Sequence, residues 1–172
     1  MKLYLLRHGE AEDHGDSRYP DDAARPLTPK GIRRTKLLAH SLRQWEVEFD
    51  VILSSPLVRA RETAEIVARG LRLGGSLEFT SYLAASGEPE KLIRQINSLR
   101  PEPQAVLLVG HEPDLSTLIS VLCSGSSHAV VVMKKGGLCR LDVDQLACGR
   151  CARVEWLLPP RLLGSSRAKR RR

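Results

Sequence analysis

The run Ala105 to Gly110, AVLLVG, constrains the fold of this chain more than any other feature. It is apolar throughout, which predicts a strand buried on both faces, as in a parallel sheet. Pro113 follows shortly after, where a proline is typical of the first turn of a helix. A strand that must be covered on both sides and that leads into a helix favours an α/β fold.

Strands and helices alternate along most of the sequence. The patterns predict strands at Lys2 to Leu6, Asp50 to Ser55 and Ser76 to Leu83, and helices at Pro29 to Trp45, Leu57 to Leu71, Pro89 to Leu99 and from Pro113 onward. Three further strands are expected at AVVVM, LCRLDVD and RVEWLL, with a hairpin at Gly136-Gly137. These elements predict a three-layer α/β/α sandwich whose sheet is mostly parallel with an antiparallel addition.

The length of 172 residues suits one core of ordinary size, so we expect a single domain over residues 1–164. Residues 165–172, SSRAKRRR, carry most of the excess positive charge and are predicted to be a solvated basic tail. Contact of this tail with nucleic acid or another polyanion is the alternative. Only 4% of residues are aromatic, which argues against a platform for stacking bases.

No apolar run approaches the roughly 20 residues that span a bilayer, so no membrane contact is expected. Arg7, His8, Glu10 and Glu12 lie where the apolar part of a signal peptide would continue. The expected location is therefore the cytoplasm. The pattern makes no prediction of oligomeric state.

The CxxC pair Cys148 and Cys151 has the spacing of half a zinc site. Cys123 and Cys139 do not supply a second half at matching spacing, and the pair does not open a helix after a strand, as a redox motif would. We expect ordinary reduced cysteines and no metal.

Basic and imidazole side chains follow the buried strands at the points where these strands end. Arg7 and His8 end the first strand, His111 follows AVLLVG, and Arg59 lies in the first turn of the helix after the second strand. The carboxyl ends of parallel strands meet at one edge of a sheet, so these four side chains are expected to converge. Two arginines and two histidines near a helix amino terminus predict a site for a phosphoryl group, which a neutral imidazole can attack.

Three segments containing these residues, LLRHGEA, SSPLVRARETA and VGHEPDLS, occur together with RPLTPKG. In this order they resemble the histidine phosphatase superfamily of phosphoglycerate mutase-like proteins, and most closely its SixA-type phosphohistidine phosphatases. The resemblance covers about Met1 to Leu122 and implies a phosphoglycerate mutase-like fold.

The resemblance also implies a role for each residue. His8 would be the nucleophile that becomes phosphohistidine, Arg7 and Arg59 would hold the phosphoryl oxygens, and His111 would donate a further hydrogen bond. Such enzymes need neither metal nor cofactor. Glu112 and Glu10 are the two candidates for a proton donor.

Relatives that act on sugar phosphates carry a long insertion after the second motif. Here only 47 residues separate Thr63 from His111, so a covering lid is not expected. An open site favours phosphohistidine on a protein or peptide as the substrate. The alternatives are a small-molecule phosphomonoesterase or mutase, and a non-catalytic module that recognises phosphate. The other histidines are predicted to face solvent: His14, His40 and His128.

Overall fold

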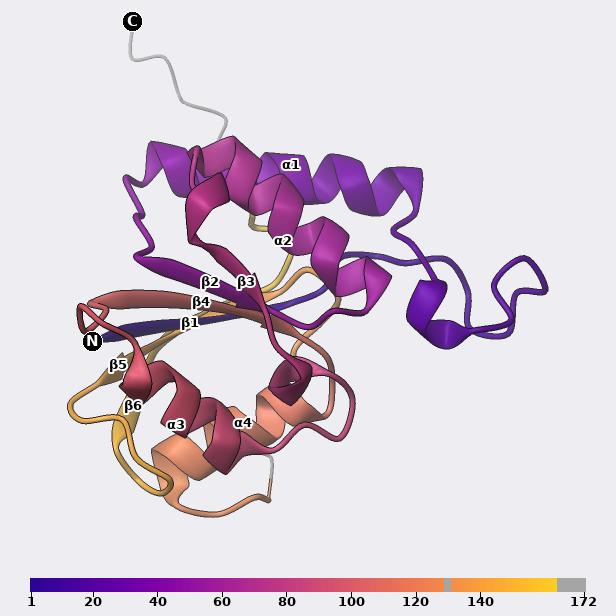
Figure 1. Ribbon diagram of the computed structural model, residues 1–172. Coiled ribbons are helices and arrows are strands. Elements are labelled where there is room, and N and C mark those ends of the chain that lie inside the picture. Colours follow the sequence, from indigo (N-terminus) through magenta and orange to yellow (C-terminus); the bar gives the residue numbers. More distant parts are fainter. Residues whose placement is uncertain (129–130, 164–172) are drawn as a thin grey trace, which may run out of the picture.

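A six-stranded sheet is the middle layer of the computed structural model, which describes residues 1–128 and 131–163 (Figure 1). Its strands are β1 Lys2–Arg7, β2 Val51–Ser54, β3 Leu77–Phe79, β4 Ala105–Gly110, β5 Leu138–Val143 and β6 Ala152–Leu158. They lie in the order β3-β2-β4-β1-β5-β6. The first four strands run parallel, whereas β5 and β6 are antiparallel additions. The prediction of a mostly parallel sheet with an antiparallel addition is confirmed.

Two pairs of helices cover the two faces of this sheet (Figure 1). They are α1 Pro29–Gln44, α2 Val58–Leu71, α3 Pro89–Ser98 and α4 Asp114–Ser124. Three short 3₁₀ turns lie between the longer elements: η1 Asp22–Ala24, η2 Gly74–Ser76 and η3 Ser81–Leu83. The α1–α2 layer and the α3–α4 layer therefore enclose the sheet in the predicted three-layer sandwich.

The central strand β1 is buried on both faces because its side chains alternate between the two helical layers. Leu3 and Leu5 belong to the apolar cluster that contains α3 and α4, and Tyr4 and Leu6 belong to the cluster that contains α1 and α2. Each of these four side chains is at most 4% exposed. This burial fixes the register of β1 and hence the direction in which its carboxyl end points.

The amino terminus of α1 is tied to the segment that follows β1. Thr28 caps the helix by accepting a hydrogen bond from the Gly31 amide at 2.9 Å, and its own amide donates to the Glu10 carbonyl at 2.9 Å. A side chain at position 31 would collide with the Glu10 carbonyl, which only glycine avoids. The helix start predicted at Pro29 is confirmed.

The strand predicted at Ser76 to Leu83 is shorter than expected. Only Leu77–Phe79 pair with β2, and the chain then turns into η3. Thr80 accounts for this change, because its amide still donates to Ser54 while its hydroxyl caps the Tyr82 amide at 3.3 Å. The composition of this run favours a strand throughout, but the strand ends before Thr80 because this residue caps the following turn.

The predicted strand AVVVM and the hairpin at Gly136-Gly137 were wrong. Residues 131–133 form no strand, and the first two residues of the run lie outside the described part. The Met133 carbonyl accepts from Arg7 Nη1, and its amide donates to Glu112, so both its backbone groups bind side chains rather than a strand. The turn before β5 instead lies against β1, since the Gly136 amide donates to the carbonyls of Arg7 and His8. The antiparallel hairpin is formed by β5 and β6.

Several other expectations concern the chain as a whole. Within the described residues no helix combines the length and the apolar character needed to cross a membrane. Across residues 1–128 and 131–163 there is no group of three or more His, Cys, Asp or Glu side chains placed to hold a metal ion. The four cysteines form no disulfide within the described residues. The tail predicted at 165–172 lies outside the described residues, so that prediction stays untested.

Candidate active site

His8 lies directly after β1, where the sheet holds it beside β4. Its amide donates to the Gly110 carbonyl at 3.0 Å, which extends the β1–β4 pairing by one residue. The ring is 4% exposed, and its Nδ1 lies 2.8 Å from the Gly9 carbonyl. A carbonyl only accepts, so Nδ1 carries the proton and Nε2 keeps its lone pair. The fold thus presents a nucleophilic nitrogen with a fixed tautomer.

His111 lies beside His8 because Arg7 and Gly110, the residues before them, are paired in register. The two imidazole rings are 5.1 Å apart between centroids. His111 Nε2 lies 2.8 Å from Ser55 Oγ, which also accepts a hydrogen bond from the Leu57 amide at 3.3 Å. When the hydroxyl of Ser55 donates to Nε2, the proton of the neutral ring lies on Nδ1. That Nδ1 is buried and has no hydrogen-bond partner.

Two arginines approach the histidines from different elements. Arg7 ends β1 and is anchored by Nη1, which donates to the Met133 carbonyl at 2.7 Å. Arg59 lies in the first turn of α2 and is 5% exposed. In both residues Nε is buried without a partner.

Together with Nδ1 of His111, the two guanidinium groups present three buried polar nitrogens that lack partners. Buried donors in proteins are almost always paired, so a cluster of three is a strong indication of a ligand. Guanidinium and imidazole N–H groups match the oxygens of a tetrahedral anion. The four residues predicted from the sequence therefore meet in one site with the chemistry of a phosphoryl-binding pocket.

Both histidines are held neutral. Burial is the largest of the causes that lower the pKa of His8 to about 3. The charges of His111, Arg59 and Arg7 act in the same direction, and the hydrogen bond to Gly9 opposes them. Burial also lowers the pKa of His111 to about 4, assisted first by Arg59. A neutral His8 is the form that attacks phosphorus, and a neutral His111 still has one N–H to donate.

These low pKa values predict a loss of stability in acid. The unfolded chain protonates both histidines near pH 6.5 whereas the folded protein does not until pH 3 to 4, so unfolding takes up protons in this window. The free energy of unfolding is therefore full above pH 6.5 and falls as the pH decreases. Between pH 7.5 and pH 5 the two histidines should together account for a loss of about 2 to 4 kcal/mol.

Urea unfolding of the wild type and of the double variant His8→Asn, His111→Asn at these two pH values measures this contribution. The double variant should lose less stability than the wild type over the same interval. An identical pH dependence in the two proteins would contradict the assignment of neutral buried rings.

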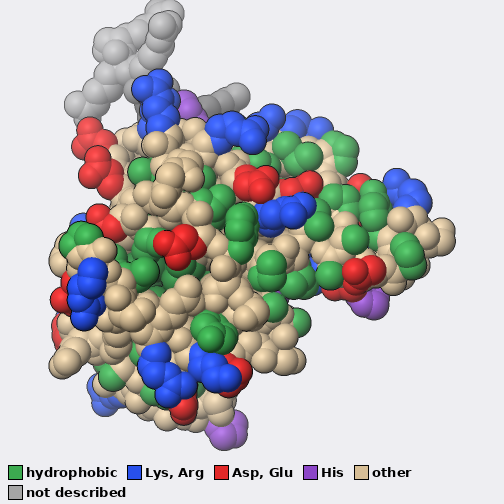
Figure 2. Space-filling model, in the orientation of Figure 1, with side chains coloured by type: hydrophobic (Ala, Val, Ile, Leu, Met, Phe, Trp, Pro, Cys, Tyr) green, Lys and Arg blue, Asp and Glu red, His purple; other side chains and the backbone are tan. Residues whose placement is uncertain are grey.

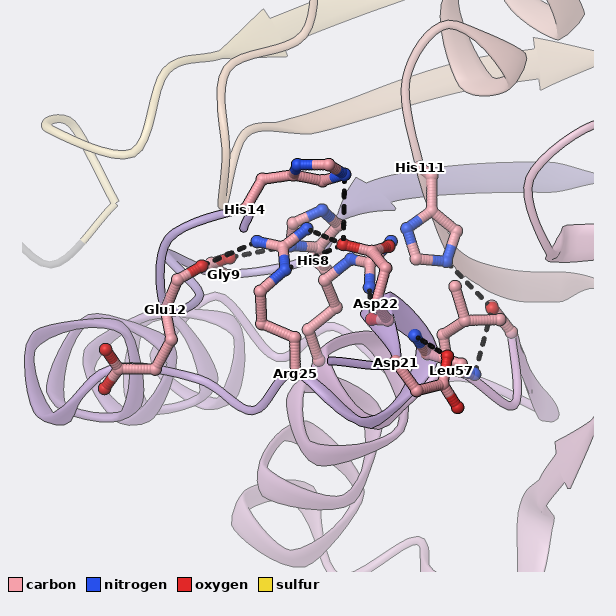
Figure 3. Close-up of polar contacts among 12 residues, drawn as sticks. His8, Gly9, Glu12, His14, Asp21, Asp22, Arg25, Leu57 and His111 are labelled. Atoms are coloured by element: carbon pink, nitrogen blue, oxygen red, sulfur yellow. Dashed lines mark hydrogen bonds and ion pairs between the residues drawn. The ribbon is translucent and has the colours of Figure 1, made fainter. Parts of the chain in front are cut away.

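Asp22 in η1 contacts the site and was missed from the sequence. Its carbonyl accepts from Arg59 Nη1 at 2.8 Å, and its carboxylate binds Arg59 Nη2 at 2.9 Å and Arg25 at 2.8 Å. Figure 3 shows the Asp22 side chain among Arg25, His14 and the two site histidines. Both Nη atoms of Arg59 are thus engaged with Asp22, whereas its Nε is buried without a partner. No local pattern predicts this contact, because η1 is short and lies far from Arg59 in the sequence.

Burial raises the pKa of the Asp22 carboxyl, but the hydrogen bond from Arg25 and the charges of Arg59, Arg25 and His14 outweigh it, and the net shift is downward. Asp22 is therefore ionised at neutral pH. The predicted bystander His14 is exposed, yet its Nε2 lies 3.8 Å from the Asp22 carboxylate at the edge of the site. His40 and His128 are exposed, as predicted.

The two carboxylates considered as proton donors are both engaged. Glu112 accepts from the Ser116 hydroxyl and from the Met133 amide at 3.1 Å. Glu10 forms ion pairs with Lys30 at 3.1 Å and Arg34 at 3.3 Å on α1. Their assignment as acids stays a prediction, and these contacts give neither carboxylate an evident proton to donate.

Thr63 on α2 links the two halves of the site. Its hydroxyl accepts from the Gly9 amide at 3.0 Å and donates to the Arg59 carbonyl at 2.7 Å. Gly9 is required there, because an added Cβ would lie 2.9 Å from Thr35 Oγ1. The residue after His8 is therefore fixed to the helix that carries Arg59, which holds the nucleophilic ring and the guanidinium in a constant relation.

Comparison with known proteins relates the sequence of this chain to several phosphatases. The family model described as histidine phosphatase superfamily (branch 1) matches residues 3–84. The phosphohistidine phosphatase SixA of Escherichia coli (strain K12) is 33% identical over 128 residues, which cover 74% of this chain and 77% of that protein. An adenosylcobalamin/alpha-ribazole phosphatase of Salmonella typhimurium is 46% identical over 70 residues, covering 41% of this chain and 34% of the relative.

A solved structure supports the same grouping. The protein histidine phosphatase SixA complexed with tungstate has a TM-score of 0.81 and 27% sequence identity, and the match covers 95% of this chain and 99% of that chain. Tungstate is a tetrahedral oxyanion like phosphate. That structure therefore combines the same fold with the kind of anion that the three unpartnered nitrogens would suit.

Proposed function

Since the chain belongs to the histidine phosphatase superfamily and is thus a phosphatase, we propose that it removes phosphate from phosphohistidine on proteins through a phospho-His8 intermediate. One observation carries this proposal. Three buried nitrogens without partners, on Arg7, Arg59 and His111, lie around a histidine whose burial keeps it neutral.

In the first step Nε2 of His8 attacks phosphorus in line with the leaving group. The new P–N bond forms with the lone pair of Nε2, and the bond to the leaving atom breaks with its electron pair going to that atom. Arg7, Arg59 and His111 neutralise and orient the equatorial oxygens. Water then attacks the phosphorus of phospho-His8 and loses a proton to the solvent. The P–N bond breaks with its electron pair returning to Nε2, and inorganic phosphate leaves.

The leaving group is the reason to favour phosphohistidine over an ester. A phosphorylated imidazole can carry a ring proton and depart as neutral imidazole, whereas an alkyl ester departs as an alkoxide unless an acid protonates it. Glu112 and Glu10 are both engaged with other groups, and Asp22 is held ionised. With these three carboxylates engaged, the site suits a leaving group that brings its own proton.

The short stretch between Thr63 and His111 supports a protein substrate. The stretch from Thr63 to His111 is fully described, and it forms the rest of α2, the short turns, β3, α3 and β4. No additional domain is inserted in it to cover His8. The E. coli relative is a phosphohistidine phosphatase, which agrees with this choice of substrate.

A small-molecule phosphomonoesterase is the second candidate, because a relative over part of the chain is an alpha-ribazole phosphatase. The substrate of a phosphomonoesterase is an ester, whose alcohol needs a proton donor in order to leave. This requirement distinguishes the two candidates experimentally. A non-catalytic phosphate-binding module no longer competes, since the chain belongs to a family of phosphatases.

The two enzyme candidates differ in their preference for leaving groups. We expect kcat/KM for phosphohistidine to exceed that for an alkyl phosphate by about 10²-fold to 10⁴-fold, the usual value of general acid catalysis. The difference should narrow for aryl phosphates, whose leaving groups need no proton. Phosphate release from a panel of these substrates at one pH measures the preference.

The variants Glu112→Gln and Glu10→Gln complete this test. Neither should change the phosphohistidine reaction greatly. Suppose instead that the wild type hydrolyses a sugar phosphate efficiently and that one of these variants loses this activity. That result would favour the small-molecule phosphomonoesterase, because it would reveal a dedicated acid.

A further inference from the structure

Helix α1 carries an unusual distribution of charge. Its 16 residues contain no Asp or Glu. Lys30 and Arg34, near its amino terminus, pair with Glu10. The later cations lie on one stripe, because Arg33, Lys36, His40 and Arg43 follow one another at spacings of three or four residues. All four are exposed, and none forms an ion pair with a carboxylate of the described chain.

The stripe borders a hollow between α1 and α2. The hollow has a volume of about 260 Å³, and its charged or titratable lining consists of Lys36, His40, Arg43 and Arg69. The last of these comes from α2 and is exposed. Its lining contains no acidic side chain. Figure 2 shows Lys and Arg side chains gathered along the top of the molecule, where Figure 1 places α1.

Small residues create this hollow. Gly70 of α2 lies so close to α1 that an added Cβ would be 2.7 Å from the Cβ of Ala39. The two helices therefore approach closely at this point, and longer side chains on either side form a rim around a shallow floor. Arg43 and Arg69 face the same space with no described carboxylate between them.

Like charges held around one hollow repel each other, and an anionic partner relieves that repulsion. The partner is recognised by negative charge combined with a small apolar floor. Single-stranded nucleic acid is a poorer fit, because the lining offers no aromatic ring on which a base can stack. In a short acidic protein segment, carboxylates can pair with the cations of the rim while apolar atoms of the segment pack on the floor.

The position of the hollow relates it to the active site. Arg59 begins α2 at the site, and Arg69 lies ten residues further along the same helix, about 15 Å away at the usual helical rise. A protein interface of ordinary size covers about 800 Å² on each partner, which spans this distance. A folded protein with its phosphohistidine at His8 can therefore reach the hollow.

We propose that this basic hollow is a docking site for an acidic segment of the phosphoprotein substrate. The proposal rests on the proposed function, since it assigns the second point at which that substrate is held. It makes the substrate an acidic protein rather than a free phosphorylated amino acid. Docking at a distance from the reacting phosphorus contributes to binding and leaves the chemical step unchanged.

The test compares two substrates of the same chemistry in the variant Lys36→Glu, Arg43→Glu, Arg69→Glu. One substrate is an acidic protein phosphorylated on histidine, and the other is free phosphohistidine. For the protein, KM should rise at least about tenfold with kcat unchanged, as expected when several favourable charge contacts become repulsive. For free phosphohistidine both parameters should stay the same, which also shows that the variant is folded.

A matched control carries the same charge change outside the α1–α2 layer: Arg94→Glu, Arg150→Glu, Arg153→Glu. It should leave KM for the acidic protein close to that of the wild type. High salt should raise KM for the protein in the wild type and have much less effect in the hollow variant.

The possible failures are distinguishable. If the wild type turns over neither substrate, the proposed function fails. If the hollow variant acts on both substrates like the wild type, or if both charge variants change equally, docking at the hollow is wrong. Loss of duplex DNA binding in the hollow variant, with unchanged kinetics on the protein, would assign the hollow to nucleic acid and overturn the proposal.

Discussion

Replacing His8 with alanine is expected to abolish turnover, with a loss on the order of 10⁴-fold or more in kcat, as when the nucleophile of a covalent mechanism is removed. Nε2 of His8 is the buried nitrogen that the Gly9 carbonyl leaves unprotonated. Quenching the wild type in base during turnover of a labelled substrate should trap phosphate on the protein. That phosphate should be stable in base, released in acid, and absent from His8→Ala.

His128→Ala is the matched control, because His128 is exposed and distant in the sequence from the site residues. It should retain full activity and the trapped phosphate. Rapid turnover by His8→Ala, or labelling at a different residue, would remove His8 from the mechanism.

Arg59→Ala should produce the second largest loss, about 10²-fold to 10³-fold in kcat, which is the usual cost of removing one preorganised donor from a transition state. Its Nε is buried without a partner, and its two Nη atoms are held by Asp22. Arg59→Lys should restore little, because a single ammonium cannot bind Asp22 and a phosphoryl oxygen in the same geometry. Initial rates on phosphohistidine, together with urea unfolding, separate lost chemistry from lost stability.

The neighbouring Arg61 provides the control. It is exposed on the same helix, and its ion pair with Glu65 is a loose surface contact of 3.8 Å. Arg61→Ala should therefore keep nearly full activity. If Arg59→Ala is no more harmful than Arg61→Ala, the guanidinium of Arg59 does not contact the reacting group.

The central part of the fold was predictable because several local sequence patterns indicated the same α/β arrangement. AVLLVG is long enough and apolar enough to specify a buried strand, and proline and threonine mark the start of α1. In a parallel sheet the carboxyl ends of neighbouring strands lie at the same edge. The meeting of His8 with His111 therefore followed from two local patterns and one topological rule, and the pairing of Arg7 with Gly110 in the structure agrees with it.

The parts that could not be predicted depend on contacts between segments far apart in the sequence. Met133 lies in a run of β-branched residues, which favours a strand, but its backbone binds Arg7 and Glu112 instead. Asp22 contacts Arg59 across 37 positions in the sequence. Ser55 and Thr63 are common residues with nothing unusual in their spacing, and their roles arise only from the partners that folding brings to them.

The position of β1 in the sheet has a consequence for biosynthesis. β1 precedes every other strand in the chain, yet it lies in the interior of the sheet between β4 and β5. At about 5 to 20 residues per second, a ribosome needs several seconds or more to make β4 after β1. During this time an apolar strand has neither of its neighbours, and its free edges can pair with other chains. The nascent protein is therefore exposed to aggregation until β4 and β5 have both emerged, and the two site histidines come together when β4 pairs with β1.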